Sequence, residues 1–256
     1  MLKIRVISMD SADRRRSMMS EQLSQQSTPW SIMDACTSEG RIPYRDDLAM
    51  SVLGRSLNRG EIGCFTSHAQ LWSELAAEPD GSAYCILEDD VLLDGDFFNR
   101  LSDLSALIQT LGYIRLYAKV PAPPHYVTPL VDMRHVVRFH RLVFGTQGYL
   151  LSKRAALTLL THTSCFYRPV DHIIDRFWDH GLPIYCVYPF PLIELNFGTS
   201  IERSRRVDVQ PDLGRKIRKA VDRTRRHLKS AQLQLKGPPK HAKDWIKTPL
   251  SEALLK

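Results

Sequence analysis

The chain has 256 residues, which is ample length for a buried core and is typical of one large domain or two small ones. Its 43% hydrophobic and 25% charged residues indicate a globular protein and argue against repeat arrays, collagen, coiled coils and disordered chains. No apolar run approaches the roughly 18 to 20 residues that cross a bilayer. Lys3 and Arg5 also argue against a signal peptide, so we expect an unsecreted protein.

The net charge of +7 is unevenly distributed along the chain. Residues 213–256 contain 13 Lys and Arg against 3 acids, a balance of +10. Residues 1–212 contain 22 basic and 25 acidic residues, a balance of −3. The sequence therefore consists of a mildly acidic body and a strongly basic tail, which require separate explanations.

The five cysteines are odd in number and widely spaced, and none forms a Cys-x-x-Cys pair. This pattern argues against a disulfide framework and against a zinc site, and it suits a reducing compartment. We expect most of the cysteines to be small buried hydrophobic residues.

The body begins with a predicted strand over residues 2–7, where apolar and basic side chains alternate. A helix with apolar residues between positions 18 and 23 follows, and a second short strand is predicted at 30–32. Residues 39–57 show no period and are expected to be irregular.

The clearest predicted helix begins at Asn58, a good N-cap with Glu61 three residues later. Apolar residues then recur at spacings of three and four up to Ala76. A turn follows, and residues 83–87 form a short apolar run that predicts a buried strand.

The second half of the body continues the alternation of strands and helices. Strands are predicted over 113–117, 136–144, 145–151 and 184–188, with a proline-rich loop over 121–129. Helices are predicted after the cap Ser152 and over 172–180 after the cap Asp171. This order predicts an α/β fold with a mostly parallel central sheet flanked by helices, whose ligands bind at the carboxyl ends of the strands.

Three acids, Glu88, Asp89 and Asp90, stand where the apolar strand 83–87 ends. Adjacent carboxylates at a buried strand end repel one another and lose hydration unless a cation or hydrogen-bond donors compensate. Alternation sends Glu88 and Asp90 to one side, where their oxygens suit Mg²⁺ or Mn²⁺ bound to phosphate. The alternative is a solvated acidic turn.

Five blocks of sequence stand out: 6–10 (VISMD) with 13–15 (DRR), 58–72 (NRGEIGCFTSHAQLW), 86–91 (ILEDDV), 145–152 (GTQGYLLS) and 169–171 (PVD). Together these blocks resemble glycosyltransferase family 25, which contains bacterial lipooligosaccharide and collagen hydroxylysine galactosyltransferases. In sequence order they cover residues 2 to about 205. The resemblance implies a GT-A-type fold, a sugar-nucleotide donor and a divalent ion, Mn²⁺ or Mg²⁺, held by an acidic motif that here reads Glu88-Asp89-Asp90.

The resemblance also implies roles for single residues. Asp90 is the first expected metal ligand and Glu88 the second, and Asp89 is expected on the donor side. Asp171 is the expected catalytic base, because an inverting transfer needs a carboxylate to take the acceptor proton. The alternative is that Asp171 only caps the helix 172–180.

The other expected donor-binding residues come from three blocks. Ser8 and Asp10 end the first strand, and Arg14 or Arg15 is expected to reach a phosphate or the base, although surface arginines are commonly only solvated. His68 is expected to shape the site, with a satisfied core histidine as the alternative. Thr146 is the last expected donor-binding residue, because it follows Gly145 in a segment where the backbone could come close to the sugar. The alternative is that this glycine belongs to an ordinary turn.

The tail contains a predicted basic amphipathic helix over residues 213–235, with apolar or small residues three or four apart. Three interpretations of this helix are possible. It binds an anionic membrane surface, it forms an arm that binds nucleic acid, or its apolar side packs on the body. Aromatic residues that stack on bases are missing from this segment, so no nucleic acid is expected as a partner.

We therefore expect a GT-A-like catalytic domain over 1–212 and a basic C-terminal helical extension over 213–256. The expected reaction transfers galactose from UDP-galactose, with inversion to a β linkage, to a saccharide acceptor of a bacterial lipooligosaccharide or lipopolysaccharide. The expected location is the cytoplasm, peripheral to the inner face of the cytoplasmic membrane. A metal-dependent nucleotidyl- or phosphotransferase and a non-catalytic nucleic-acid-binding protein are the alternatives.

Overall fold

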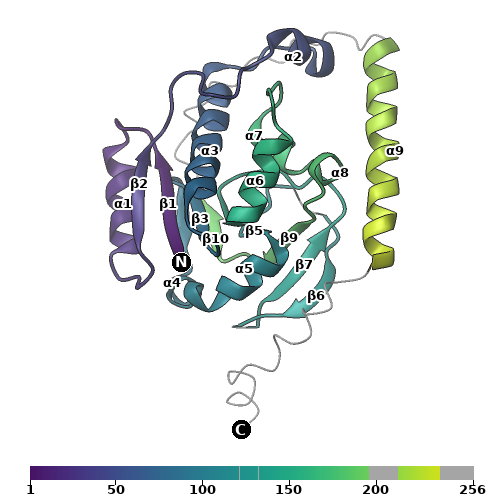
Figure 1. Ribbon diagram of the computed structural model, residues 1–256. Coiled ribbons are helices and arrows are strands. Elements are labelled where there is room, and N and C mark those ends of the chain that lie inside the picture. Colours follow the sequence, from purple (N-terminus) through teal and green to yellow (C-terminus); the bar gives the residue numbers. More distant parts are fainter. Residues whose placement is uncertain (121, 132, 196–212, 237–256) are drawn as a thin grey trace.

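The computed structural model describes residues 1–120, 122–131, 133–195 and 213–236 (Figure 1). The strands are β1 (Leu2–Ser8), β2 (Trp30–Asp34), β3 (Ala83–Glu88), β4 (Val91–Leu93), β5 (Tyr113–Arg115), β6 (His125–Pro129), β7 (His135–Phe139), β8 (Gly148–Ser152), β9 (Ile184–Tyr188) and β10 (Leu192–Glu194). The helices are α1 (Asp13–Leu23), α2 (Asp46–Leu53), α3 (Arg59–Ala77), α4 (Gly95–Asn99), the 3-10 helix η1 (Leu101–Leu104), α5 (Ser105–Leu111), α6 (Lys153–Thr161), α7 (Val170–Ile174), α8 (Phe177–His180) and α9 (Leu213–Lys236).

The central sheet has eight strands in the order β2-β1-β3-β8-β5-β9-β7-β6. Parallel pairs join β2, β1 and β3 and also β5 and β9, while β8 and β7 run opposite to their neighbours. Six of the eight strands therefore point the same way, which confirms the predicted mostly parallel α/β fold. Strands β4 and β10 form a separate antiparallel pair beyond the sheet.

Helices cover both faces of the sheet, and the alternation of side chains along the strands explains how (Figure 1). On β3, Cys85 and Leu87 enter the core beneath α1, α4 and α5. Tyr84 and Ile86 enter the opposite core, beneath α3, α6 and α7. A strand buried on both faces is apolar throughout, which is why residues 83–87 show no polar alternation.

Helix α3 confirms the prediction made from its N-terminus. The Asn58 side chain accepts the Glu61 backbone N–H, and the Glu61 side chain accepts the Asn58 N–H, which completes a capping box. Phe65, Trp72 and Leu75 from this helix are fully buried. The helix is consequently a rigid support for the side chains on its first turns.

The sequence-based prediction was wrong at several elements. Residues 39–57 contain α2, a helix with only Ala49 buried, so no apolar period announces it. The proline-rich segment contains β6 at the sheet edge, where Pro129 ends the strand. Residues 94–111 form α4, η1 and α5, which were not predicted, and β7 ends at Phe139, earlier than expected.

The predicted helix 172–180 is two short helices, α7 and α8, separated at Asp175. The carboxylate of Asp175 is fully buried against Arg115 and accepts the backbone N–H groups of Val143 and Phe144. Asp175 keeps a helical backbone conformation, and the helical path breaks at the next residue, Arg176, where ψ is 54°. Gly181 ends this segment in a left-handed conformation, as glycine commonly does after a helix.

Helix α9 confirms the helix predicted in the basic tail and contacts α8 and α2. Figure 1 shows it standing along one side of the body. The expected boundary after residue 212 and residues 237–256 of the extension lie outside the described residues. No helix in the described ranges has both the length and the apolar character that crossing a membrane requires.

Candidate active site

A cavity of about 510 Å³ opens where β1 and β3 end. Its walls come from the end of β1, from α1, from the segment after β2, from the first three turns of α3 and from the acids after β3. Cavities in parallel α/β sheets characteristically lie at the carboxyl ends of the strands. The cavity therefore lies at the position predicted from the fold class.

The cavity wall between α3 and the segment after β2 depends on Gly63. A Cβ atom at this position would lie 2.3 Å from the backbone oxygen of Cys36, so only glycine allows this approach. Ser67, one turn later, accepts the Cys36 backbone N–H and donates to the Gly63 carbonyl oxygen. These contacts hold the first turns of α3 against the cavity.

Asp89 faces the end of β1 and is already compensated. The Ser8 hydroxyl donates to its Oδ2 at 2.5 Å, and a guanidinium nitrogen of Arg15 lies 3.0 Å from its Oδ1. Burial raises the pKa of Asp89, although Ser8 and Arg15 oppose that rise. Of the predicted donor-side residues, Ser8, Arg15 and Asp89 are therefore brought together at the cavity.

Glu88 points to the other side of β3, as strand alternation predicts. Its Oε1 accepts the Thr146 hydroxyl at 2.5 Å and lies 3.7 Å from Nε2 of His68. Burial favours a higher pKa for Glu88, but the contacts with His68 and Thr146 outweigh it and leave the pKa lowered. Glu88 is thus an ionised carboxylate at the cavity wall.

Asp90 is the uncompensated member of the acidic cluster. Its Oδ1 is buried and has no hydrogen-bond partner among the described residues. Burial, together with the charges of Glu88, Asp89 and Glu194, raises the pKa of Asp90 to about 7. A cation bound at Asp90 would remove this penalty, since it would offset the repulsion between the carboxylates.

Glu194 is a cavity residue that the sequence reasoning missed. It lies on β10, which pairs with β4 immediately after the acidic cluster, and the Leu195 N–H donates to the Asp90 carbonyl oxygen. Its carboxylate accepts hydrogen bonds from Tyr117, Lys119 and Gln147 at 2.9 to 3.0 Å. The signal in the sequence is only a short apolar run that ends in an acid.

His68 is buried in the core and also lines the cavity. Its Nδ1 lies 2.8 Å from the Tyr149 hydroxyl, whose oxygen also accepts the Trp72 indole N–H at 2.9 Å. His68 Nε2 has no hydrogen-bond partner in the described part of the chain. The ring is consequently fixed at one nitrogen and open at the other.

Four of the predicted residues do not line the cavity: Asp10, Arg14, Thr146 and Asp171. The side chain of Asp10 is 92% exposed, and Arg14 is also exposed. Arg16 instead reaches the end of β1, where it donates to the Ser8 and Met9 carbonyl oxygens and pairs with Asp34.

Asp171 is not the N-cap of its helix, because Pro169 occupies that position and α7 begins at Val170. The alternative interpretation of Asp171 as a cap was therefore wrong. Its Oδ1 accepts the His172 N–H at 2.8 Å, and its Oδ2 accepts the Gly145 N–H at 3.1 Å. Asp171 is partly buried and is not among the described residues that line the cavity, although Gly145 connects it to Thr146.

The sequence blocks around the cavity match a known protein family. The model of glycosyltransferase family 25, described as an LPS biosynthesis protein, matches residues 1–174. The chain belongs to glycosyltransferase family 25. The match includes the cavity residues contributed by β1, α1, α3 and β3, together with Gln147, while Glu194 lies beyond it.

Several relatives of this family 25 chain have names that refer to glycan synthesis. "Lacto-N-neotetraose biosynthesis glycosyltransferase LgtE" of Neisseria gonorrhoeae is 28% identical over 89% of this chain and 85% of its own length. "Lipooligosaccharide biosynthesis protein lic2B" of Haemophilus influenzae is 26% identical over 92% and 91%. "Procollagen galactosyltransferase 1-A" of Xenopus laevis is 30% identical over 54% of this chain, which spans only 23% of that protein.

Proposed function

We propose that the protein is a glycosyltransferase that transfers a hexose from a nucleotide sugar to a saccharide acceptor of a bacterial lipooligosaccharide or lipopolysaccharide. The observation that carries this proposal is the uncompensated Asp90 carboxylate at a cavity also lined by Arg15, Arg59 and Lys119. A site with both carboxylates and cations suits a divalent ion and the diphosphate of a nucleotide sugar. Family membership and the names of the relatives support the same activity.

The residues at the end of β3 fit a Mn²⁺ or Mg²⁺ ion. Asp90 provides a buried oxygen without a partner, and Glu88 provides an ionised carboxylate on the same side of the strand. We propose Asp90 as the first ligand and Glu88 as the second. When bound, the ion supplies positive charge that stabilises the departing diphosphate.

The chain's own residues would orient the donor. Ser8 and Arg15 hold Asp89 in place at the end of β1, where a GT-A-type fold binds the nucleoside, and Thr146 holds Glu88. His68 is fixed by Tyr149 at the cavity wall. Asp10 and Arg14 are outside the cavity lining, so we do not assign them to the donor.

We propose Asp171 as the base that takes the acceptor proton in an inverting transfer that forms a β linkage. Its carboxylate is partly buried, and two backbone N–H groups fix its orientation. Loss of a general base lowers turnover by on the order of 10²-fold or more. Asp171→Asn preserves the shape of the side chain, so near-normal turnover by the folded variant would eliminate the base role.

Thermal unfolding of the full chain with candidate donors tests the activity proposal. We propose UDP-galactose as the donor, and we expect it to raise Tm only when Mn²⁺ is present, because the ion links Asp90 to the diphosphate. Stabilisation by a nucleoside triphosphate and not by a UDP-sugar would favour a nucleotidyl- or phosphotransferase. Stabilisation by neither ligand would overturn the donor assignment, and UDP-glucose serves as the matched control for the sugar.

Helix α9 supports a peripheral membrane location for the enzyme. It attaches to the body through ion pairs, in which Asp222 pairs with Arg176 and Arg168 and Arg225 pairs with Asp179, and through Leu233, which packs against a buried hydrophobic cluster. Its apolar stripe faces away from the body, with the following fractional exposures: Leu213 74%, Ile217 55%, Val221 51% and Leu228 68%. The interpretation that this stripe packs on the body was therefore wrong.

We propose that this exposed stripe and its flanking lysines and arginines bind an anionic membrane surface. Each basic residue near such a surface contributes about 1 kcal/mol, and the apolar side chains add insertion into the interface. The full-length variant Ile217→Gln/Val221→Gln/Leu228→Gln should sediment much less with phosphatidylglycerol vesicles than wild type. Leu157→Gln, at an apolar residue on α6 that is 45% exposed, is the control. Equal sedimentation of all three proteins would overturn this assignment.

A further inference from the structure

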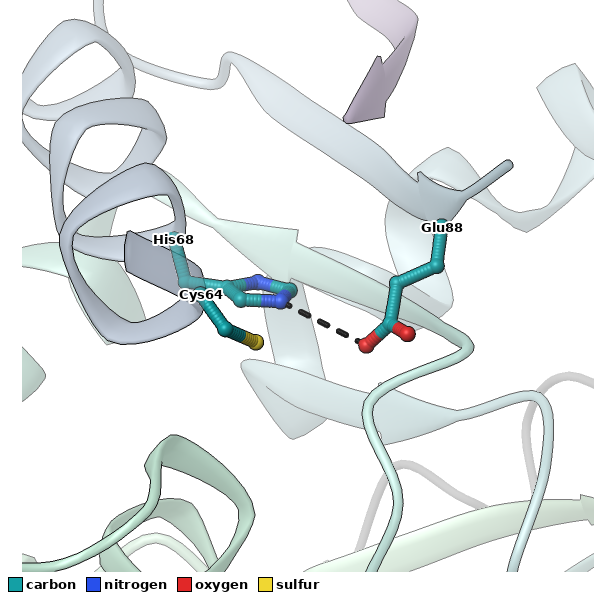
Figure 2. Close-up of side chains that lie close together, drawn as sticks. All are labelled: Cys64, His68 and Glu88. Carbon is teal, nitrogen blue, oxygen red and sulfur yellow. Dashed lines mark ion pairs between the residues drawn. The ribbon is translucent and has the colours of Figure 1, made fainter. Parts of the chain in front are cut away.

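Three potential metal ligands of different chemistry meet at the cavity wall (Figure 2). Cys64 and His68 are four residues apart and therefore lie on the same face of α3. Figure 2 shows both side chains directed toward Glu88, which comes from the end of β3. Cys64 Sγ, a ring nitrogen of His68 and a carboxylate oxygen of Glu88 all lie within 4.8 Å of one another.

The state of His68 supplies a second, independent indication of a ligand. Its side chain is 1% exposed, and its Nε2, 3.7 Å from Glu88 Oε1, has no hydrogen-bond partner within the described ranges. A buried polar nitrogen that makes no hydrogen bond loses hydration, and the contact with Glu88 Oε1 at 3.7 Å compensates that loss only in part. A metal ion between the three side chains would bind this nitrogen directly.

The chemistry of the three side chains indicates which class of metal they would bind. One thiol, one imidazole and one carboxylate are the ligands that zinc-like ions prefer, whereas Mg²⁺ and Ca²⁺ prefer oxygen alone. A nitrogen and an oxygen bound to tetrahedral zinc at about 2.0 to 2.2 Å lie about 3.3 to 3.5 Å apart. The separation of 3.7 Å between His68 Nε2 and Glu88 Oε1 is slightly longer, so a small movement of the Glu88 side chain would bring both atoms to one ion.

We propose that Cys64, His68 and Glu88 form a binding site for one zinc-class divalent ion, Zn²⁺ or Co²⁺. On binding, the Cys64 thiol loses its proton to solvent and its sulfur becomes a thiolate ligand. All three residues line the cavity, so the fourth coordination position opens toward the space assigned to the donor.

Neighbouring contacts would stabilise the bound arrangement. The Tyr149 hydroxyl contacts His68 Nδ1 at 2.8 Å and leaves Nε2 for the metal. A hydroxyl oxygen has two lone pairs, so it accepts both the Trp72 N–H and an Nδ1–H once Nε2 is occupied. The Thr146 hydroxyl donates a hydrogen bond to Glu88 and so fixes the second ligand. Partners of this kind orient metal ligands in proteins generally.

Titration of the full-length protein with Co²⁺ tests the site without any assay of transfer. A thiolate bound to tetrahedral Co²⁺ gives a charge-transfer band in the near ultraviolet together with intense visible bands. We expect both sets of bands to saturate at one equivalent in wild type, and Zn²⁺ to abolish them by displacement. Absence of the charge-transfer band in wild type would overturn the proposal.

Two variants and a matched control locate the ligands. Cys64→Ser should lose the charge-transfer band, and Glu88→Gln should weaken Co²⁺ binding by more than about tenfold. Cys36→Ser changes another thiol at the same cavity and should keep the band. A band that persists in Cys64→Ser, or disappears in Cys36→Ser, would refute the assignment, and circular dichroism verifies that each variant is folded.

Alkylation of cysteines provides a measurement that does not depend on spectra. Zn²⁺ should slow the alkylation of Cys64 in wild type, as followed by mass spectrometry of peptides, and should leave that of Cys36 unchanged. Equal protection of both cysteines would contradict a site built on Cys64.

A consequence for regulation rests on the proposed function, because Glu88 is shared with the Mn²⁺ or Mg²⁺ site. Zn²⁺ should inhibit transfer in the presence of Mn²⁺ by withdrawing Glu88, and Cys64→Ser should be inhibited less. Binding of Co²⁺ without inhibition by Zn²⁺ would remove the regulatory role while leaving the site in place. Failure of donor binding in the thermal assay would instead affect only the proposed function.

Discussion

The buried ion pair between Arg115 and Asp175 provides a prediction with a definite magnitude. Their side chains are 1% and 0% exposed, and the pair contacts the backbone of residues 143–145. Arg115 also donates to the carbonyl oxygens of Phe144 and Gly145, and Asp175 accepts the N–H groups of Val143 and Phe144. Phe144 and Gly145 both have positive φ, 53° and 83°, so this segment depends on its contacts.

Replacing Arg115 with methionine leaves the Asp175 carboxylate buried without its counter-charge. Breaking a buried pair on one side costs about 3 to 5 kcal/mol, which is a large part of the 5 to 15 kcal/mol typical of a domain. Two backbone N–H groups still serve Asp175, which favours the lower end of that range. We therefore expect Arg115→Met to lower the free energy of unfolding by about 3 kcal/mol at pH 8.

The pH dependence of this loss follows from the direction of the pKa shift. Burial raises the pKa of Asp175 even in wild type, and Arg115 is the main opposing influence. Removing Arg115 raises the pKa further, and a folded acid with a raised pKa loses stability as the pH rises above its unfolded pKa of about 4. The loss in free energy of unfolding caused by Arg115→Met should consequently grow from about pH 5 to about pH 8.

Urea unfolding followed by circular dichroism at several pH values measures both quantities. Arg154→Met, at an exposed arginine of α6, is the matched control and should change stability by less than about 0.5 kcal/mol. The double variant Arg115→Met/Asp175→Asn should be more stable than Arg115→Met, since it removes the unpaired charge. A loss below about 1 kcal/mol, or one independent of pH, would refute the reasoning.

Three further predictions concern the cavity. Asp90→Asn should raise the urea midpoint at pH 8 without metal, because the pKa of Asp90 is raised to about 7 and the charged carboxylate destabilises the fold. This gain in stability should vanish near pH 4. Mn²⁺ should no longer stabilise the variant. Gly63→Ala should cost about 1 to 3 kcal/mol in the same assay, since its Cβ would lie 2.3 Å from the Cys36 oxygen, and an unchanged midpoint would contradict that packing. Glu194→Gln should lower the pKa of Asp90 in an NMR titration by removing one neighbouring charge, whereas a rise would refute the electrostatic account.

Local patterns in the sequence predicted those features that depend on near neighbours along the chain. The capping box at Asn58 and the apolar spacing after it predicted α3, because a helix is stabilised by residues three and four apart. The apolar run 83–87 with acids after it predicted both β3 and the carboxylates at the sheet edge. The sidedness of Glu88 and Asp89 followed from strand alternation and is observed in their different partners.

The tertiary structure decided which distant residues share a site. Glu194 reaches Asp90 only because β10 pairs with β4, and a three-residue strand carries no periodic signal. The environments of Asp171 and Asp175 depend on residues far away in the chain, because their carboxylates contact Gly145 and Arg115.

By itself, the sequence determined the family, most of the elements and the position of the acidic cluster. Only the tertiary structure decided that α9 attaches through ion pairs and Leu233 while its apolar stripe stays exposed, and that Cys64, His68 and Glu88 converge. The physical reason is that hydrophobic periodicity and capping act within a few residues of the chain. The pairing of strands and the burial of charges bring together residues that are far apart in sequence, and no local pattern encodes those partners.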